Sequence, residues 1–469
     1  MAALHDLSAL QLLAAYRSRA LSPVEVMQDV LGHTERWEPL IHATYALDAK
    51  SAMVQAEASQ ARWLAGRPMG ALDGVPAMVK ENIATQGVPI PLGTAASELV
   101  PAERDTPPAA RLREAGAVIV AKTTMPDYGM LSSGLSSFHA LTRNPWDLTK
   151  NPGGSSAGAA AAAAAGCAPL HVGTDIGGSV RLPAGWCGIF ALKPSAGRIP
   201  IYPPYAGRVA GPMTRSVGDA ALLMGVLSQP DARDPTRLAP QQIEWQKLDR
   251  DVRGLKIGLL MDAGWGLPVE PEVRAAVEAA ADAFEAAGAV VEPLQSFMTR
   301  TMADGMDRFW RCRAWTEISA LPAARRRLVL PFIHAWASGA AGLSGEQVFH
   351  GYSQMAAMRD AAVAACLPFD FVLTPTSPIP AYAAELPCPT DDPSHPFEHI
   401  AFTLPYNMSE QPAASINAGH TAAGLPIGLQ IVGQRFDDLG VLQLALAWER
   451  LRPAQPPWPA PPAPLGPAP

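Results

Sequence analysis

The fold and the chemistry of this chain depend on two stretches, Gly153-Gly154-Ser155-Ser156-Ala157-Gly158 and Gly173-Thr174-Asp175-Ile176-Gly177-Gly178-Ser179-Val180-Arg181. Each carries a serine directly after two glycines. Because glycine adopts positive φ at little cost, the second stretch can curve and direct the N–H groups of residues 176–179 toward one reacting oxygen. Upstream, Lys80 follows the apolar segment Val75–Val79, where desolvation would lower its pKa and favour the neutral amine. The three segments offer a nucleophile, a proton carrier and a base without a histidine.

Each feature also has a simpler structural interpretation. Ser179 is compatible with a capping residue in a tight Gly-Gly turn. Ser155 and Ser156 precede an alanine-rich helix and are compatible with an ordinary N-cap. Lys80 could end a strand and pair with Glu81. Taken singly, these residues do not separate structure from catalysis.

Other serine chemistries compete with this interpretation. The first stretch formally matches G-x-S-x-G with Ser156 as nucleophile, but that elbow needs a preceding strand. The proline-containing segment Asn144–Pro152 cannot form a central strand. A serine–histidine–acid site would need one of the ten histidines, and His139 and His420 are conceivable, but each is more typical of a surface or packing position. His395 and His399 give only a weak metal signal, and no phosphate loop or dinucleotide fingerprint occurs.

The rest of the chain alternates short apolar segments with helical patterns, which predicts an α/β sheet covered by helices. Helices are expected within residues 4–65, where Ser22-Pro23-Val24-Glu25 has the signature of a capped helix start. Strands are predicted over residues 75–79, 117–121, 169–172, 255–260, 290–291, 371–376 and 424–433. Further helices are predicted over residues 109–115, within 158–170 and over 272–287, together with an irregular helical region over 300–365 and a last helix that ends near 451.

Prolines dominate from Arg452 onward, which predicts an extended, poorly packed tail or, alternatively, a proline-motif ligand.

Composition narrows the functional classes. The chain has 469 residues and a formal charge of −7 without a basic run, which argues against nucleic acid as a direct partner. Its five cysteines include no CxxC pair, which argues against structural zinc and for a reducing compartment. The N-terminus lacks a signal-peptide pattern, and the alanine-rich segment 158–170 is too short to span a bilayer. We therefore expect a cytoplasmic protein that does not bind membranes.

Taken together, the motifs resemble the amidase signature family. The resemblance covers most of residues 1–450 and rests on Asp73-Gly74-Val75-Pro76, the two serine stretches, Pro183–Gly188, Leu192–Arg198, Phe371–Pro375, Pro405-Tyr406-Asn407 and Gln411-Pro412-Ala413. It implies an α/β fold with a large, mixed, twisted sheet and helices on both sides. A single domain would span 1–451, with N-terminal helices in 1–65, the signature core in 70–215, a variable region that could cover the pocket in 220–350, a C-terminal sheet portion in 370–451 and the tail in 452–469.

The family's Ser–cis-Ser–Lys triad implies roles for individual residues. Ser179 would be the nucleophile, Ser155 the bridging serine after a cis peptide bond, and Lys80 the base. The N–H groups of Ile176, Gly177, Gly178 and Ser179 would form the oxyanion hole. Ser156, Asp175 and Arg181 would support the site from behind. No cofactor or metal is implied.

The resemblance leaves the substrate open. Apolar or aromatic residues near the motifs could line a pocket for a small hydrophobic or aryl amide, with carbamates and esters as further substrates: Tyr128, Met130, Phe138, Ile201, Tyr202 and Tyr205. The alternative is the A subunit of a glutamyl-tRNA amidotransferase, a partnered glutaminase, although Pro126–Met130 differs from the stretch associated with that protein. A catalytically silent binding scaffold is a third hypothesis. A homodimer is compatible with the sequence.

Overall fold

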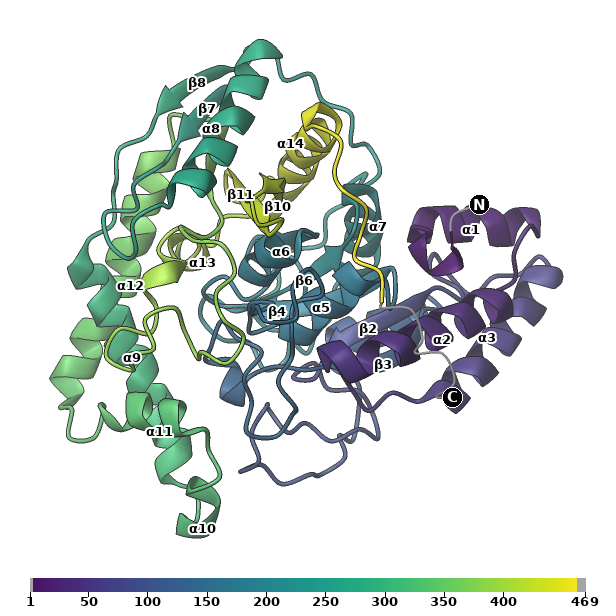
Figure 1. The fold of residues 1–469 in the computed structure, drawn as a ribbon, viewed down its shortest axis with the longest axis horizontal. Coiled ribbons are helices and arrows are strands. Elements are labelled where there is room, and N and C mark those ends of the chain that lie inside the picture. Colours follow the sequence, from purple (N-terminus) through teal and green to yellow (C-terminus); the bar gives the residue numbers. More distant parts are fainter. Residues whose placement is uncertain (1–2, 462–469) are drawn as a thin grey trace, which may run out of the picture.

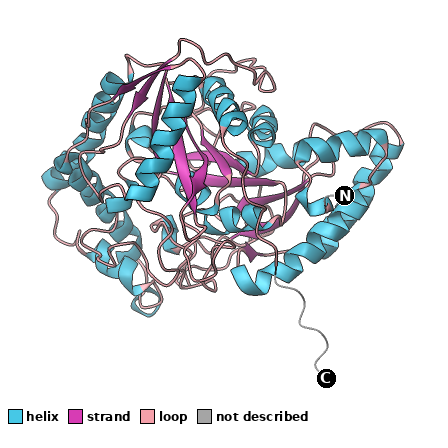
Figure 2. Cartoon of the chain, turned by 45° about the horizontal axis from the view of Figure 1, so that its top comes forward, coloured by secondary structure: helices cyan, strands magenta, loops and turns pink. Residues whose placement is uncertain are grey.

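One sheet runs through the molecule in the computed structural model, which describes residues 3–461. Figure 2 shows its strands in the middle, surrounded by helices. In sheet order, the strands are β1 (Thr44–Tyr45), β3 (Val118–Thr123), β2 (Pro76–Lys80), β4 (Leu170–Asp175), β6 (Val209–Thr214), β5 (Phe190–Lys193), β10 (Ala413–His420), β11 (Pro426–Gly433), β9 (Phe371–Pro375), β7 (Lys256–Leu259) and β8 (Val290–Pro293).

The sheet is mixed, as predicted. Strands β3, β2 and β4 run parallel to one another, and so do β9, β7 and β8. The neighbouring pairs between these two groups, from β4/β6 to β11/β9, are antiparallel. The α/β fold class is therefore confirmed. Because β2 and β4 are parallel neighbours, Lys80 and the second serine stretch lie at the same carboxyl end of these two strands.

Helices cover both faces of the sheet, and other helices make up the two ends of the molecule. The helices are α1 (Ala9–Ser18), α2 (Pro23–Ile41), α3 (Ala49–Leu64), α4 (Pro107–Glu114), α5 (Ala157–Ala165), α6 (Arg181–Cys187), α7 (Val217–Leu227), α8 (Pro271–Ala286), α9 (Arg300–Ser319), α10 (Ala323–Arg326), α11 (Pro331–Ser338), α12 (Gly345–Cys366), α13 (Pro405–Met408) and α14 (Asp438–Leu451), with short 3-10 helices at Leu4–Asp6, Asp127–Gly129 and Glu398–Ile400. In Figure 1, α1–α3 and α9–α12 lie at opposite ends of the molecule.

Strand β11 shows how its two faces are covered. Its alternate residues Ile427, Leu429 and Ile431 enter one hydrophobic core together with apolar side chains of α8 and α14. Gly428 points to the opposite face, where a Cβ atom would lie 2.7 Å from the Cα atom of Gly185 in α6. The absence of side chains at both glycines therefore lets α6 lie directly on the sheet.

The alanine-rich segment forms the buried helix α5, as predicted. All nine of its residues are buried. A Cβ atom on Gly158 would lie 2.2 Å from the carbonyl oxygen of Ala43, so only a very small residue fits at this turn. The helix begins directly after Ser156 and thereby fixes the first serine stretch against the sheet.

Several predicted elements are present with shifted ends, and a few strands were not predicted. The capping box at Ser22 and Glu25 begins α2, as expected. Central strand β6 was not predicted because it contains Gly211 and Pro212, two residues that strands normally disfavour. Here the glycine is required, since a Cβ atom on Gly211 would lie 2.0 Å from the carbonyl oxygen of Leu192 in β5.

The first part of the proline-rich tail touches the body through one aromatic side chain, although none of residues 452–461 is buried. Residues 452–461 form no helix or strand, but Trp458 contacts the core beneath α5 and α6. The Arg215 guanidinium lies 4.5 Å from the centre of the Trp458 ring. One tryptophan and one cation–π contact thus anchor the segment. Residues 462–469 lie outside the described part of the chain.

The helices within residues 3–461 fall short, in length or in apolar character, of what a bilayer crossing requires.

Candidate active site

Lys80 is the last residue of β2 and lies entirely in the interior. Its Nζ atom donates a hydrogen bond to Ser155 Oγ over 2.8 Å, and a longer one to the carbonyl oxygen of Thr174 over 3.4 Å. Because Lys80 is 0 % exposed while Ser155 and Ser179 line an open cavity, the amine has no direct access to a bound molecule. Ser155 lies between the buried amine and the cavity.

Ser155 occupies the turn between an irregular segment and α5. The peptide bond between Gly154 and Ser155 is cis. The neighbouring Ser156 joins the two serine stretches, because its N–H donates to the Ser179 carbonyl oxygen over 3.1 Å and its Oγ donates to the Thr174 carbonyl oxygen over 3.2 Å. Ser156 is fully buried and does not line the cavity, so it is not available as the nucleophile of a G-x-S-x-G elbow.

Burial makes Lys80 a base that is available near neutral pH. Desolvation, followed by the nearby charge of Arg208, lowers the pKa of Lys80 from its ordinary 10.5 to about 7. Burial also lowers the pKa values of Lys122 and Lys193 to about 7. A lowered pKa therefore does not distinguish Lys80. The hydrogen bond to a cavity-lining serine does, since Lys122 and Lys193 donate to backbone carbonyl oxygens instead.

An ion pair behind the second stretch holds its loop. Arg181, the first residue of α6, donates to both carboxylate oxygens of Asp175 over 3.0 Å, and both side chains are fully buried. The remaining Arg181 donors reach side chains or carbonyls of the C-terminal portion, at Thr403, Asn407 and Gln430. Burial by itself would raise the pKa of Asp175, but the Arg181 charge overcomes it and holds the pKa below the ordinary range. The carboxylate is thus a fixed anchor.

The geometry revises the predicted set of oxyanion donors. The Gly178 N–H donates to Asp175 Oδ1 over 2.8 Å and is already used. Among the described residues, the N–H groups of Ile176, Gly177 and Ser179 have no such acceptor. Gly178 instead serves the turn, since its φ of +124° is a conformation that other residues rarely adopt. Three free donors therefore remain beside Ser179.

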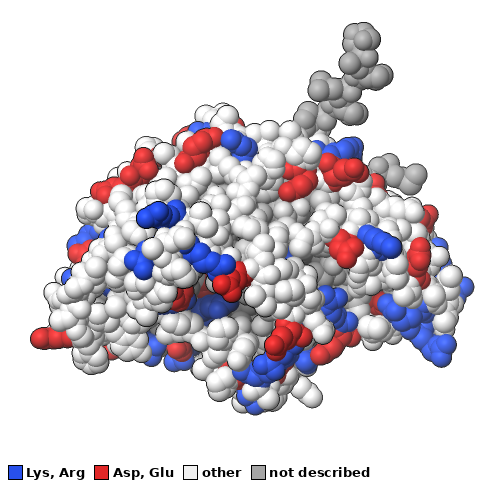
Figure 3. Space-filling model, turned by 90° about the horizontal axis from the view of Figure 1, so that it is seen from below, with Lys and Arg blue, Asp and Glu red and all other residues white. Residues whose placement is uncertain are grey.

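A cavity of about 590 Å³ opens in front of Ser155 and Ser179. Its apolar wall includes Ile90, Leu92, Met125, Tyr128 and Met130. Besides Asp175, which is paired with Arg181, its lining includes the charged residues Glu103, Arg104, Arg208, Arg313 and Glu317. Figure 3, which views the molecule from below, shows both basic and acidic side chains at a hollowed part of the surface. The site combines an apolar wall with charges that the sequence did not place there.

Three of the six residues predicted to line the pocket do so: Tyr128, Met130 and Tyr202. The other three do not. Phe138 packs edge-on against the rings of Tyr45 and His139, and Ile201 joins the large hydrophobic core. Tyr205 stacks under Arg313, whose guanidinium lies 4.0 Å from its ring centre. The predicted lining is therefore corrected for Phe138, Ile201 and Tyr205.

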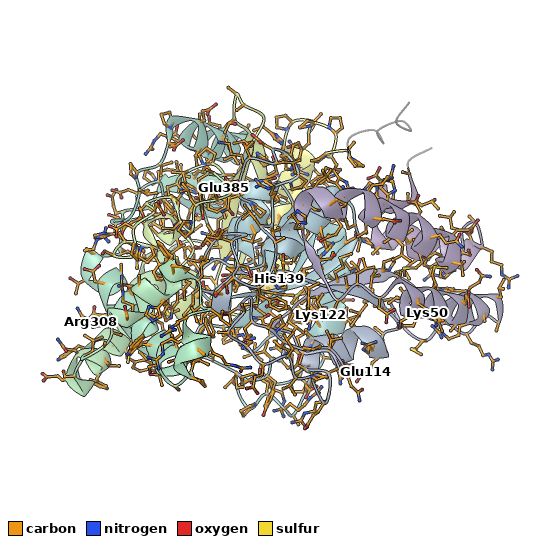
Figure 4. All side chains as sticks on the ribbon, turned by 60° about the horizontal axis from the view of Figure 1, so that its bottom comes forward. Lys50, Glu114, Lys122, His139, Arg308 and Glu385 are labelled. Atoms are coloured by element: carbon orange, nitrogen blue, oxygen red, sulfur yellow. The ribbon has the colours of Figure 1, made fainter. Side chains whose placement is uncertain are left out.

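Histidine is not part of this arrangement. His139 pairs through Nε2 with the buried carboxylate of Glu81, which also accepts the Gly93 N–H. In Figure 4, His139 and Lys122 lie near the middle of the view and Lys50 lies toward its side, and the side chains of His139 and Lys122 are both buried. Glu81 was the acid that could have neutralised Lys80, but it is engaged with His139 and Gly93 instead. The Lys80 amine therefore does not pair with Glu81 and donates its hydrogen bond to Ser155 instead.

Comparisons with known proteins place the whole chain beside amidases. A family model described as Amidase matches residues 25–442. The A subunit of the glutamyl-tRNA(Gln) amidotransferase of Myxococcus xanthus (strain DK1622) is 34% identical over 95% of this chain and 97% of its own length. The crystal structure of a bacterial aryl acylamidase of the amidase signature family superimposes with a TM-score of 0.88, 30% identity and coverage of 96% of this chain and 97% of that one. A peptide amidase from Stenotrophomonas maltophilia superimposes with a TM-score of 0.83 and 25% identity, over 98% of this chain and 99% of its own.

Proposed function

This chain belongs to the amidase signature family and is an amide hydrolase, and we propose that it acts on small amides through an acyl-enzyme on Ser179. The observation that carries the proposal is the 2.8 Å hydrogen bond from buried Lys80 to Ser155, at the back of a cavity that Ser179 also lines. A base, a relay hydroxyl and a nucleophile are thereby available in series.

In the first half-reaction, neutral Lys80 accepts the proton of Ser155, which accepts the proton of Ser179 as Ser179 Oγ bonds to the amide carbon. The N–H groups of Ile176, Gly177 and Ser179 stabilise the resulting oxyanion. The carbon–nitrogen bond then breaks, and the relay returns one proton to the leaving nitrogen. The products are a free amine and an ester between the acyl group and Ser179.

In the second half-reaction, water attacks the ester carbon and passes a proton to Ser155 and on to Lys80. The bond from carbon to Ser179 Oγ breaks, and the relay reprotonates that oxygen. A carboxylic acid leaves, and Lys80 is neutral again. The two half-reactions balance in protons and electrons, so each cycle consumes one amide and one water molecule.

The cavity favours substrates with an apolar or aryl portion. Ile90, Leu92 and Met130 form an apolar wall, and Tyr128 offers a ring beside it. Carbamates and esters present the same carbonyl to Ser179 and are expected as further substrates.

The test combines covalent labelling with a substrate panel. We expect a fluorophosphonate to label Ser179 and the purified protein to hydrolyse at least one class among aryl anilides, fatty amides, amino-acid amides, carbamates and esters. Mass spectrometry of the digested adduct identifies the labelled serine. An unlabelled Ser179 with no turnover on any class would contradict the proposal and would support a silent binding scaffold.

A second candidate function is the partnered glutaminase, favoured by the 34% identity to the A subunit of an amidotransferase over nearly the whole chain. The two functions use the same triad and differ in dependence on partners. Glutaminase activity that appears only with a co-purifying protein would favour this candidate. Hydrolysis of anilides by the isolated chain would favour the free-standing enzyme.

We expect kcat/KM to rise with pH through an apparent pKa near 7 and to level off above it. The lowered pKa of Lys80, about 7, means that its amine is protonated below this pH and cannot accept a proton, and is neutral above it. Initial rates at subsaturating anilide over the stable pH range give the profile. The Lys122→Met variant is the matched control, because its buried lysine has the same lowered pKa without a serine contact. A flat wild-type profile, or loss of the inflection in the control, would contradict the assignment.

A further inference from the structure

Arg208 lies beside the nucleophile loop without having been predicted there. It immediately precedes β6, whose register pairs Val209 with Asp175 at the end of β4. The residue before Val209 therefore lies opposite the start of the Ile176–Ser179 loop. Arg208 lines the same cavity as Ser155 and Ser179, and it is close enough to Lys80 for its charge to lower the pKa of that amine.

The Arg208 guanidinium has no counter-ion in the described part of the chain. Among residues 3–461, no carboxylate oxygen lies within 4.0 Å of its nitrogens. Its one hydrogen bond within the described chain is a long contact of 3.4 Å to the Pro203 carbonyl oxygen. Burial and the neighbouring Arg313 lower the pKa of Arg208 to about 10, so the group remains charged at neutral pH. A half-buried cation with unused donors is costly unless an anion joins it.

The other charged residues of the cavity are accounted for by their surroundings. Arg313 stacks on Tyr205 and has Glu317 at 3.7 Å, and the Glu317 side chain is 51% exposed. Arg104 and Glu103 are both exposed, and Asp175 is paired with Arg181. Arg208 alone among the six combines partial burial, a position next to the nucleophile loop and the absence of a carboxylate partner in the described chain.

We propose that Arg208 binds a carboxylate of the substrate, so that the preferred substrates are amides that also carry a carboxylate. The planar guanidinium can donate two parallel hydrogen bonds to such a group, which fixes both its position and its orientation. The apolar wall then receives the uncharged part of the same molecule. This inference rests on the proposed amide hydrolysis at Ser179 and names its substrate class.

The test uses pairs of amides that differ in one carboxylate. One pair is 4-acetamidobenzoate and 4-acetamidotoluene, with the carboxylate on the amine side. The other is succinanilate and butyranilide, with the carboxylate on the acyl side. We expect the wild-type enzyme to prefer the carboxylated member in at least one pair. In Arg208→Met, that ratio of kcat/KM values should fall by roughly 10-fold to 100-fold, the effect of losing a charge-assisted contact. Arg208→Lys should keep part of the preference.

Three controls make the outcome decisive. Arg104→Met removes an exposed arginine of the same cavity and should leave the ratio within about threefold, which separates direct contact from general attraction. Removing Arg208 also acts on Lys80, but that effect changes both members of a pair alike and cancels in the ratio. Binding of the carboxylated substrate to Ser179→Ala, with and without Arg208→Met, gives the same comparison without turnover.

The proposal is overturned if the wild type shows no preference in either pair, if Arg208→Met lowers both members equally, or if Arg104→Met has the same effect as Arg208→Met. In each of these cases, uncharged amides would still be hydrolysed with Ser179 labelled. Failure of this inference is thus distinct from failure of the proposed function. If Arg208→Met does not fold, Arg208→Gln and Arg208→Lys provide the same comparison.

Discussion

Ser179→Ala is expected to lower kcat on any amide substrate by roughly five to six orders of magnitude, close to complete loss. Alanine removes the only atom that can form the acyl bond, while the loop stays in place because its anchors are Asp175 and Arg181. What remains is the small contribution of binding and of the free N–H groups beside the site. Initial rates with high enzyme concentration, together with circular dichroism to verify folding, measure this loss.

Ser156→Ala is the informative companion, because Ser156 is the competing nucleophile in the G-x-S-x-G interpretation. Its Oγ is hydrogen-bonded to the Thr174 backbone and does not line the cavity, so this variant should still accept the fluorophosphonate label at Ser179. Ser179→Ala should accept none. A label that follows Ser156, or a Ser179→Ala enzyme with near-normal turnover, would overturn the assignment of the nucleophile.

Lys80→Met is expected to lower kcat/KM by roughly three to five orders of magnitude. Methionine fills a similar volume in the interior but cannot accept the proton of Ser155, so the relay has no base. Lys80→Arg should be about as inactive, because a guanidinium stays protonated throughout the accessible pH range. Steady-state rates and the rate of fluorophosphonate acylation measure the same loss at the first chemical step.

The matched control for this variant is Lys122→Met. Lys122 is also buried and has a pKa lowered to about 7, but its Nζ donates to the Ile83 carbonyl oxygen rather than to a serine. We expect its activity to stay within about tenfold of the wild type, the change caused by repacking alone. Equal losses in both variants would mean that removing any buried lysine damages the fold, and would leave Lys80 without a specific role.

Much of the framework could be predicted from the sequence, because the signals are local. The capping box at Ser22 and Glu25, the buried helix of alanines and the apolar strand before Lys80 each follow from residues close together in the chain. The resemblance of the motif blocks to one family placed Lys80, Ser155 and Ser179 in one hypothesis. The structure brings Lys80 and Ser155 into contact and places Ser155 and Ser179 on one cavity.

Strand β6 and the lining of the cavity could not be predicted in this way. Gly211 and Pro212 argue against a strand by propensity, yet close packing against Leu192 requires the glycine there. Apolar character nominated Phe138, Ile201 and Tyr205, but all three pack against other residues. Composition near a motif does not reveal which way a side chain points.

What the sequence by itself determined is the set of reacting groups and the backbone turns that present them, since glycine pairs and short-range caps act within a few residues. Only the tertiary structure decided that Asp175 accepts the Gly178 N–H and that Glu81 pairs with His139. It also decided that Arg208 lines the cavity with no carboxylate partner among residues 3–461. These outcomes depend on strands and helices distant in the chain, and hydrogen bonding and charge pairing are settled only when those elements meet.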